Sequence, residues 1–291
     1  MIRLLCFILL SFCAGGIAAQ TGSDIILFDL KQVDHVLVVS GGKNITARKG
    51  YDNQPFFDPV KPLIYFASFN DSGRSDIKVY QYHKNSTVNL TVTAEREYSP
   101  TVTPDGQFIS CIIQRDNGEQ DLGRYPVKGG EAEVLINDLV IGYHAWINRE
   151  QLLLFVLDGK DGNSLHFYDL PSKKDTVLAN GIGRSLHAIP GTGKMSFVQR
   201  VSEKELLVKA FNPASMEITT IAPALPGQDH LTWLNEHTLL MSDGTKLYVY
   251  DTLTNKGWQP VTIEGDVSML KGITRLAVNK KASKLAVVVS E

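Results

Sequence analysis

Cysteine is scarce in this chain of 291 residues, which holds three: Cys6, Cys13 and Cys111. The first two lie in an N-terminal apolar segment that we expect to be removed, so the mature chain would keep Cys111 alone. A single cysteine excludes an internal disulfide framework. Cys111 lies within the apolar residues 108–113, which indicates a buried small hydrophobe rather than a nucleophile.

The chain also lacks a large excess of either positive or negative charge. The chain has 29 Lys and Arg against 31 Asp and Glu, a formal net charge of −2 with neutral histidines, and no basic block. Nucleic acid is therefore not expected as a partner, because proteins that bind it gather Lys and Arg on one surface. Beyond the N-terminus no run is long and apolar enough to cross a bilayer, so we expect no membrane insertion.

Helical periodicity is the third absence. No stretch combines apolar residues at a period of about 3.6 with capping residues, so we expect almost no helix. Instead, β-branched and aromatic residues alternate with polar ones between Gly, Asn, Asp and Pro, which is typical of short strands. Nothing in the sequence requires a cofactor or a second subunit, so we expect no cofactor and a monomer.

The N-terminal segment has the pattern of an export signal. A basic residue precedes the apolar residues 4–12, and small residues follow up to Ala19. We predict that residues 1–19 are a signal peptide and that the protein is exported, to the periplasm or the medium. A buried strand or an anchor helix is the alternative. Lipidation at Cys13 is not expected, because the bulky Phe12 precedes it.

A recurring sequence motif, called the phrase below, is the most informative feature present. It reads YDNQPFFDP from residue 51 and EYSPTVTPDG from residue 97, so that Pro55 and Pro100 are 45 residues apart, as are Pro59 and Pro104. Weaker copies follow, and the six copies end at residues 59, 104, 148, 190, 235 and 279. Several short strands in each unit of forty-odd residues are the signature of a β-propeller.

The ends of the chain predict how the ring closes. The last unit holds two strands, up to residues 285–289, and two further strands at residues 25–30 and 36–39 precede the first full unit. We therefore predict an all-β, six-bladed propeller of four-stranded blades, closed by pairing of the N-terminal strands with the C-terminal strands. Residues 20–291 would form this single domain, with blades at 50–94, 95–138, 139–181, 182–225, 226–268, and 269–291 completed by 24–48.

The repeat unit resembles the propeller repeats of the TolB family. The segment Thr103-Pro104-Asp105-Gly106 followed by an apolar strand is the best match, and residues 76–80 resemble the family's third strand. Residues 57–60 depart from Pro-Asp-Gly, and the later units keep only fragments. The resemblance implies a propeller in an exported, often bacterial, protein, but no single function, since such propellers serve as binding platforms and as enzymes. TolB also has an N-terminal domain, for which we expect no room here, so its role and partner are not carried over.

The topology places a candidate site at one end of the axial channel. The phrase opens the innermost strand of each blade, and Pro-Asp-Gly turns the chain at the opposite face, so the starts of all inner strands converge around the channel mouth. A ring of carboxylates, imidazoles and guanidinium groups at a concave mouth is the default binding site. The candidate ligand-binding residues are Asp52, Asn53, Glu97, Tyr98, Tyr143, His144, Arg184, His187, His230 and Arg275.

A structural origin of this ring is the alternative to ligand binding. Repeat proteins place similar residues at similar offsets for structural reasons. The three histidines and Glu97 could supply a metal site, but they lie one blade apart, so we assign no metal ligands. Residues 183–187 begin like a nucleophile elbow but lack its last Gly and its following helix, and we assign no catalytic residue.

These features favour a non-enzymatic role. We expect a binding or interaction platform for a protein, peptide or glycan at the channel mouth. The alternative is a hydrolase or lyase that uses the same mouth, with His144 or His187 as base and possible assistance from a metal. A third hypothesis is an assembly role in the cell envelope through the outer rim.

Overall fold

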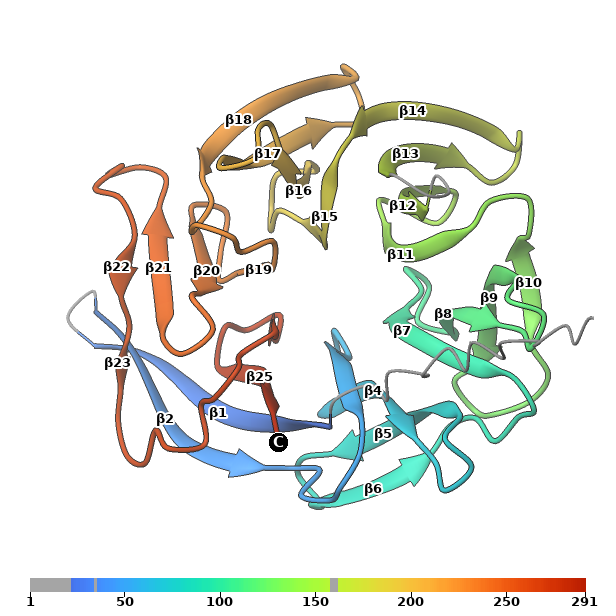
Figure 1. Ribbon diagram of the computed structural model, residues 1–291, viewed down its shortest axis with the longest axis horizontal. Helices are drawn as coiled ribbons and strands as arrows, with labels where there is room; N and C mark the ends of the chain where they lie inside the picture. Colours follow the sequence, from blue (N-terminus) through green and yellow to red (C-terminus); the bar gives the residue numbers. More distant parts are fainter. Residues whose placement is uncertain (1–21, 34–35, 158–161) are drawn as a thin grey trace, which may run out of the picture.

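The computed structural model describes residues 22–33, 36–157 and 162–291 (Figure 1). The predicted signal peptide at residues 1–19 and its cysteines lie outside this part of the chain. All regular structure in the described residues is strand, β1 to β25, and no helix there is long and apolar enough to cross a membrane. The expectation of almost no helix is therefore confirmed for this part of the chain.

Five sheets of four consecutive antiparallel strands, and one sheet that joins the two ends of the chain, form a ring (Figure 1). We number them blades 1 to 6 in chain order. The strands of blades 1 to 5 are β3 (Asp52–Phe57), β4 (Leu63–Phe69), β5 (Ser75–Gln81), β6 (Ser86–Asn89); β7 (Arg96–Val102), β8 (Phe108–Gln114), β9 (Gln120–Pro126), β10 (Glu133–Ile136); β11 (Ile141–Trp146), β12 (Gln151–Leu157), β13 (Asn163–Asp169), β14 (Lys174–Asn180); β15 (Ile182–Ala188), β16 (Met195–Arg200), β17 (Leu206–Asn212), β18 (Glu217–Pro223); β19 (Leu231–Trp233), β20 (Thr238–Ser242), β21 (Leu247–Asp251) and β22 (Gln259–Pro260).

Blade 6 closes the ring through both ends of the chain. Its strand order is β23 (Thr262–Ile263), β2 (Val36–Asn44), β1 (Ser23–Val33), β25 (Lys284–Ser290) and β24 (Arg275–Val278). Strand β1 pairs antiparallel with β25 from Ser23 opposite Ser290 to Asp29 opposite Lys284. The six-bladed fold and its closure by the terminal strands are thus confirmed.

Strand β23 was not expected from the sequence. It pairs in parallel with β2, Val38 lying opposite Thr262, and it makes blade 6 five-stranded. The chain leaves blade 5 and runs along the outer edge of blade 6 before it returns to the axis as β24. Covering that edge removes a row of unpaired backbone groups.

The core lies between neighbouring blades. The second strands are buried on both faces, as in β4, β8 and β12, because each sheet packs against two neighbours. One cluster, for example, joins Leu240 and Leu247 of blade 5 to Leu285 and Val287 of blade 6. The outer strands carry fewer buried residues, and β6 is exposed throughout. Apolar second strands therefore set the spacing of the blades around the axis.

The predicted turn at the far face is present in blade 2. Strand β7 ends at Val102 and β8 begins at Phe108, with Pro104-Asp105-Gly106 between them. The Gly106 amide donates to the Thr103 carbonyl at 2.8 Å, and Gly106 has a φ of 69°, where an L side chain is strained. The inner strands consequently start at the opposite face, where the mouth of the channel lies.

Candidate functional site

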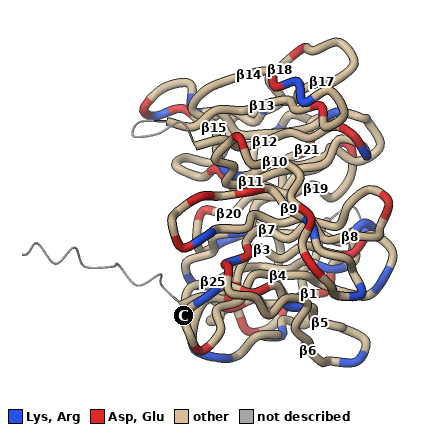
Figure 2. Tube along the Cα trace, turned by 90° about the vertical axis from the view of Figure 1, so that its right-hand side faces the viewer, with Lys and Arg blue, Asp and Glu red and all other residues tan. Residues whose placement is uncertain are grey.

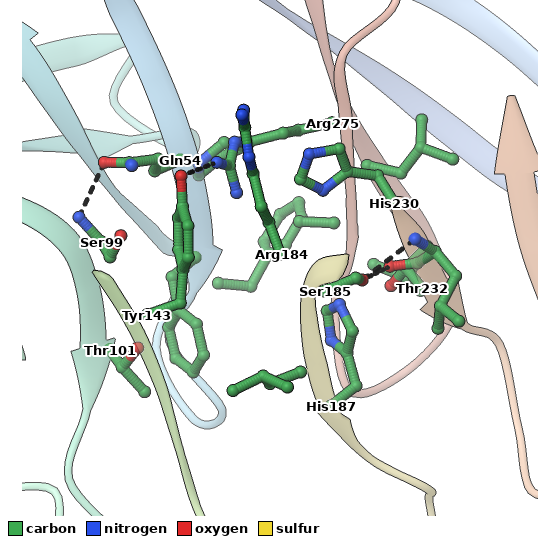
Figure 3. A pocket seen from close by; sticks show the side chains of 18 of the residues that line it. Gln54, Ser99, Thr101, Tyr143, Arg184, Ser185, His187, His230, Thr232 and Arg275 are labelled. Carbon is green, nitrogen blue, oxygen red and sulfur yellow. Dashed lines mark hydrogen bonds between the residues drawn. The ribbon is translucent and has the colours of Figure 1, made fainter. Parts of the chain in front are cut away.

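Two adjoining cavities follow the axis from the mouth. The mouth cavity, of about 730 Å³, is lined by residues that include Tyr51, Tyr98, Gln120, Arg200 and Asp229. The channel cavity, of about 320 Å³, lies deeper and is lined by residues that include Ser99, His187, His230 and Arg275. Three residues, Gln54, Tyr143 and Arg184, line both cavities and mark the neck between them (Figure 3).

Seven of the ten predicted site residues line these cavities. They are Tyr98, Tyr143, His144, Arg184, His187, His230 and Arg275. The other three, Asp52, Asn53 and Glu97, line neither cavity, and the carboxylate found in the mouth lining is that of Asp229 instead.

Glu97 is buried between blades instead. Its carboxylate accepts hydrogen bonds from the hydroxyls of Thr91 at 3.1 Å, Tyr125 at 3.0 Å and Thr93. Burial raises the pKa of Glu97, and its hydrogen bonds with Thr93, Tyr125 and Thr91 oppose that rise. Thr91 also accepts the backbone N–H of Ile77 at 2.8 Å, so the carboxylate belongs to a network that holds the linker after blade 1.

Asp52 occupies the equivalent position one repeat earlier. Its carboxylate is fully buried and accepts a charged hydrogen bond from Arg48 at 2.9 Å. Burial raises the pKa of Asp52 although its hydrogen bond with Ser68 and the charge of Arg48 lower it. Arg48 and Asp52, like Thr93 and Glu97, are four residues apart in successive repeats, which makes both acids structural anchors of the linkers.

The inner strands of blades 1 and 2 each have a backbone bulge just after the acid. The β3–β4 register shifts between Asn53 and Phe56, and the β7–β8 register shifts between Tyr98 and Thr101. A register shift changes which side chains face the channel. The bulges contain Gln54 and Ser99, at φ 58° and 54°.

These bulge residues carry backbone strain at the neck of the channel. A left-handed conformation is unfavourable for both Gln54 and Ser99, and each precedes a proline, which restricts it further. The backbone N–H of Ser99 donates to the Gln54 side-chain oxygen at 2.7 Å (Figure 3). This bond ties the inner strand of blade 1 to that of blade 2 at the edge of the channel.

Figure 3 also shows a contact that crosses the channel. The Arg275 guanidinium donates to the Tyr143 hydroxyl at 2.8 Å and lies 4.8 Å from the centre of its ring. Tyr143 is held in turn by an edge-to-face contact with Phe155, at 5.4 Å between ring centres. Because these residues come from blades 6 and 3, on opposite sides of the ring, the pair narrows the neck.

His144 lies on the same inner strand but in drier surroundings. Its Nε2 is 2.7 Å from the Ser110 hydroxyl, which also accepts the indole N–H of Trp146 at 2.8 Å. Its Nδ1 is buried and finds no partner among the described residues. Burial lowers the pKa of His144 to about 3, so the imidazole is neutral at physiological pH.

His187 and His230 face the channel on the side opposite Tyr143 (Figure 3). Burial, and then the charge of Arg275, lower the pKa of His187 to about 4. Burial lowers the pKa of His230 most, followed by the charges of Arg275 and Arg184. Both imidazoles are therefore neutral hydrogen-bonding groups beside two permanent cations. In the parts of the chain that the structure covers, no three His, Cys, Asp or Glu side chains are grouped as metal ligands.

Some lining residues were missed because they do not lie at the starts of inner strands. Gln120 begins β9 and Arg200 ends β16, yet both line the mouth cavity. Second strands end, and third strands begin, at the face where inner strands start. The topology alone could therefore have indicated these positions.

Comparison with solved structures gives propellers of the same architecture. A TolB candidate from Agrobacterium tumefaciens has a TM-score of 0.72 and 10% identity, covering 94% of this chain and 99% of its own. A chain of the nidogen/laminin complex has a TM-score of 0.61 and 12% identity, covering 92% and 98%. TolB from Acinetobacter baumannii has a TM-score of 0.59 and 12% identity over 92% of this chain, which spans 63% of the TolB length.

No protein-family model and no curated protein matches the sequence. At 10–12% identity, similarity to these solved structures supports the fold and not the function. The resemblance drawn from the Pro-Asp-Gly repeats is confirmed at that level, and the chain has a TolB-like, six-bladed β-propeller fold.

Proposed function

We propose that the protein is an exported binding platform that takes up a segment of a protein or peptide at the mouth of its channel. The observation that supports this most is the mouth cavity of about 730 Å³, which opens into the channel and mixes tyrosines with polar and charged side chains. Aromatic residues and Arg are the residues that most often supply binding energy at protein interfaces. Export rests on the pattern of the N-terminal segment.

The structural neighbours are compatible with this role. One of them is a propeller in a complex between two proteins, nidogen and laminin. That partnership belongs to nidogen and laminin, and only the use of a propeller as a platform is brought to this chain. A glycan ligand, which the sequence left open, becomes an outcome of the test.

Hydrolase or lyase chemistry at the same mouth would need a base, and the sequence suggested His144 or His187. His144 is hydrogen-bonded to Ser110 between blades 2 and 3, and its pKa of about 3 makes it a weak base. His187 forms no ion pair with a carboxylate in the described residues, so nothing specific supports it as an activated base.

A selection from a displayed peptide library on the immobilised protein tests the proposal. Gln120→Trp would obstruct part of the mouth cavity, and Leu253→Trp, at a residue 71% exposed on blade 5, is the matched control. Selected peptides should lose at least tenfold in affinity for Gln120→Trp and bind Leu253→Trp like the parent. Equal binding to both variants, or enrichment from a glycan array and none from the peptide library, would overturn it.

A further inference from the structure

The channel cavity has an unusual balance of charge. Three cationic side chains line it, Arg184, Arg275 and Lys280, and among the described residues no Asp or Glu does. The chain as a whole is slightly acidic, with a net charge of −2, and charges of both signs are mixed along its loops (Figure 2). The excess of positive charge is therefore local to the channel lining, where Arg275 is half-buried and Arg184 and Lys280 are exposed.

Arg184 has no partner for its guanidinium. No hydrogen bond or ion pair involves that group within residues 22–33, 36–157 and 162–291, although the side chain lies at the neck (Figure 3). The nearby Asp229 carboxylate is 3.4 Å from the backbone nitrogen of Arg184 and 3.5 Å from Nε2 of His230. A guanidinium carries five N–H donors in a planar fork that matches a carboxylate.

Arg275 is fixed in place and still has donors to spare. One of its nitrogens donates to Tyr143, and the ring of Tyr143 supports its plane. Holding the group in this way reduces the side-chain entropy that a ligand would otherwise have to remove. The neutral imidazoles of His187 and His230 lie beside it and add hydrogen-bonding capacity without adding charge.

The remaining lining limits which anion fits. The channel cavity of about 320 Å³ has room for about ten water molecules, and much of its wall is apolar, including Pro55, Phe56 and Leu276. An apolar wall favours an organic acid over a strongly hydrated inorganic phosphate. Arg275 covers one face of Tyr143, and Tyr51 packs on Phe69 at 4.8 Å, so these two tyrosines offer less free aromatic surface to a sugar ring.

We propose that the neck of the channel binds a carboxylate of a peptide through Arg184 and Arg275. The carboxylate belongs to an Asp or Glu side chain or to the C-terminus of the bound segment. This inference rests on the proposed function and specifies the chemistry of its ligand. The peptide approaches through the mouth cavity, and its acidic group replaces the missing counter-charge at the neck.

Four N-acetylated tetrapeptides, measured by titration calorimetry at low salt, test the inference. Three alanines are followed by Glu or Gln, each with a free or an amidated C-terminus, so that the side-chain and terminal carboxylates are varied separately. At least one carboxylate-bearing peptide should bind tenfold or more tightly than the neutral Gln amide. The tighter of the two single-carboxylate peptides identifies the source of the group.

Variants connect the binding to the two arginines. Arg184→Gln should weaken the acidic peptides at least tenfold, and Arg149→Gln, which removes an exposed arginine from the β11–β12 turn, should leave them unchanged. Arg275→Gln should have an effect of similar size. Arg275→Lys keeps the charge and loses the planar fork, and it replaces Arg275→Gln if melting curves show that the latter unfolds.

The outcomes separate this inference from the proposed function. Equal binding of acidic and neutral peptides, unchanged affinity in Arg184→Gln, or full displacement by inorganic phosphate at the peptide's own concentration would each overturn the carboxylate site. If the peptides bind without regard to their charge and Gln120→Trp abolishes that binding, the mouth is still the binding site and the proposed function stands. If none of the four peptides binds, the carboxylate inference fails, and the library selection then decides the proposed function separately.

Discussion

His144 and His187 lie on inner strands of neighbouring blades, and their surroundings give the same imidazole different roles. His144 is enclosed with Ser110 and Trp146, and burial alone lowers its pKa. His187 faces the channel, where the charge of Arg275 adds to the effect of burial. At the scale of the residue, His144 is held by a contact between blades 2 and 3, and His187 faces the open channel.

The pKa of His144 predicts how acid affects stability. The unfolded chain binds a proton at this imidazole below about pH 6.5, and the folded protein binds it only near pH 3. Between these values the free energy of unfolding falls as the pH falls, by about 1.4 kcal/mol per pH unit for this group. Its share of the loss between pH 6.5 and 5 is about 2 kcal/mol.

Urea unfolding at pH 6.5 and pH 5 measures this loss in the parent, in His144→Gln and in a control. The comparison is between the two pH values within each protein, so it does not depend on any constant effect of the substitution. His144→Gln should lose about 2 kcal/mol less than the parent over this range. His83→Gln, at an exposed imidazole, should behave like the parent, and an equal loss in all three proteins would contradict the assignment.

At the scale of the element, neighbouring blades are joined by a repeated hydrogen bond. The indole N–H of Trp146 donates to Ser110 at 2.8 Å, and that of Trp233 donates to Ser196 at 2.8 Å. In each case a tryptophan on an inner strand reaches a serine on the second strand of the preceding blade. The two pairs differ in one respect, because Ser110 also contacts His144.

That difference predicts unequal losses when each serine is removed. Ser110→Ala removes contacts to the Trp146 indole, the His144 imidazole and the Thr101 carbonyl. Ser196→Ala removes contacts to the Trp233 indole and the His187 carbonyl. An unsatisfied buried group costs about 1–3 kcal/mol, so we expect about 3 kcal/mol for Ser110→Ala and about 1.5 kcal/mol for Ser196→Ala. Denaturant unfolding gives both values, and a larger loss in Ser196→Ala would refute the argument.

At the scale of the whole molecule, the ring is closed by a non-covalent seam. Strands β1 and β25 pair over seven residues, and Lys284 forms an ion pair with Asp29 at the end of the seam. The described part of the chain contains one cysteine, Cys111, which is free, so no disulfide supports this closure. The stability of the ring therefore depends on the pairing and burial of β1.

Deletion of residues 25–30 tests the role of the seam. It should expose the edge of β25 and the apolar face of blade 6, and the protein should aggregate through the open edge. Thr262→Pro, which disturbs only the short pairing of β23 with β2, is the control and should stay in solution and elute like the parent. Size-exclusion chromatography with thermal unfolding distinguishes the two. A soluble deletion variant that unfolds cooperatively would disprove the dependence on β1.

The sequence predicted the ring because each repeat is defined by local turn residues and apolar strand residues. Pro-Asp-Gly at residues 104–106 fixes a turn, and the apolar residues beside it fix a buried strand, whatever lies across the channel. It predicted the site less completely. Asp52 and Glu97 lie at the starts of inner strands, as predicted, but their carboxylates are hydrogen-bonded to other side chains and line neither cavity.

The sequence by itself determined the number of blades and the use of both chain ends in one sheet, because the repeat recurs about every 45 residues and leaves two strands over at each end. It did not determine β23. Only the tertiary structure decided that Arg275 meets Tyr143, 132 residues away, and that the cavity between them holds cations without acids. Side chains from opposite blades share a channel only after the ring has closed. Their contacts therefore follow from the geometry of ring closure and cannot be predicted from the local sequence pattern.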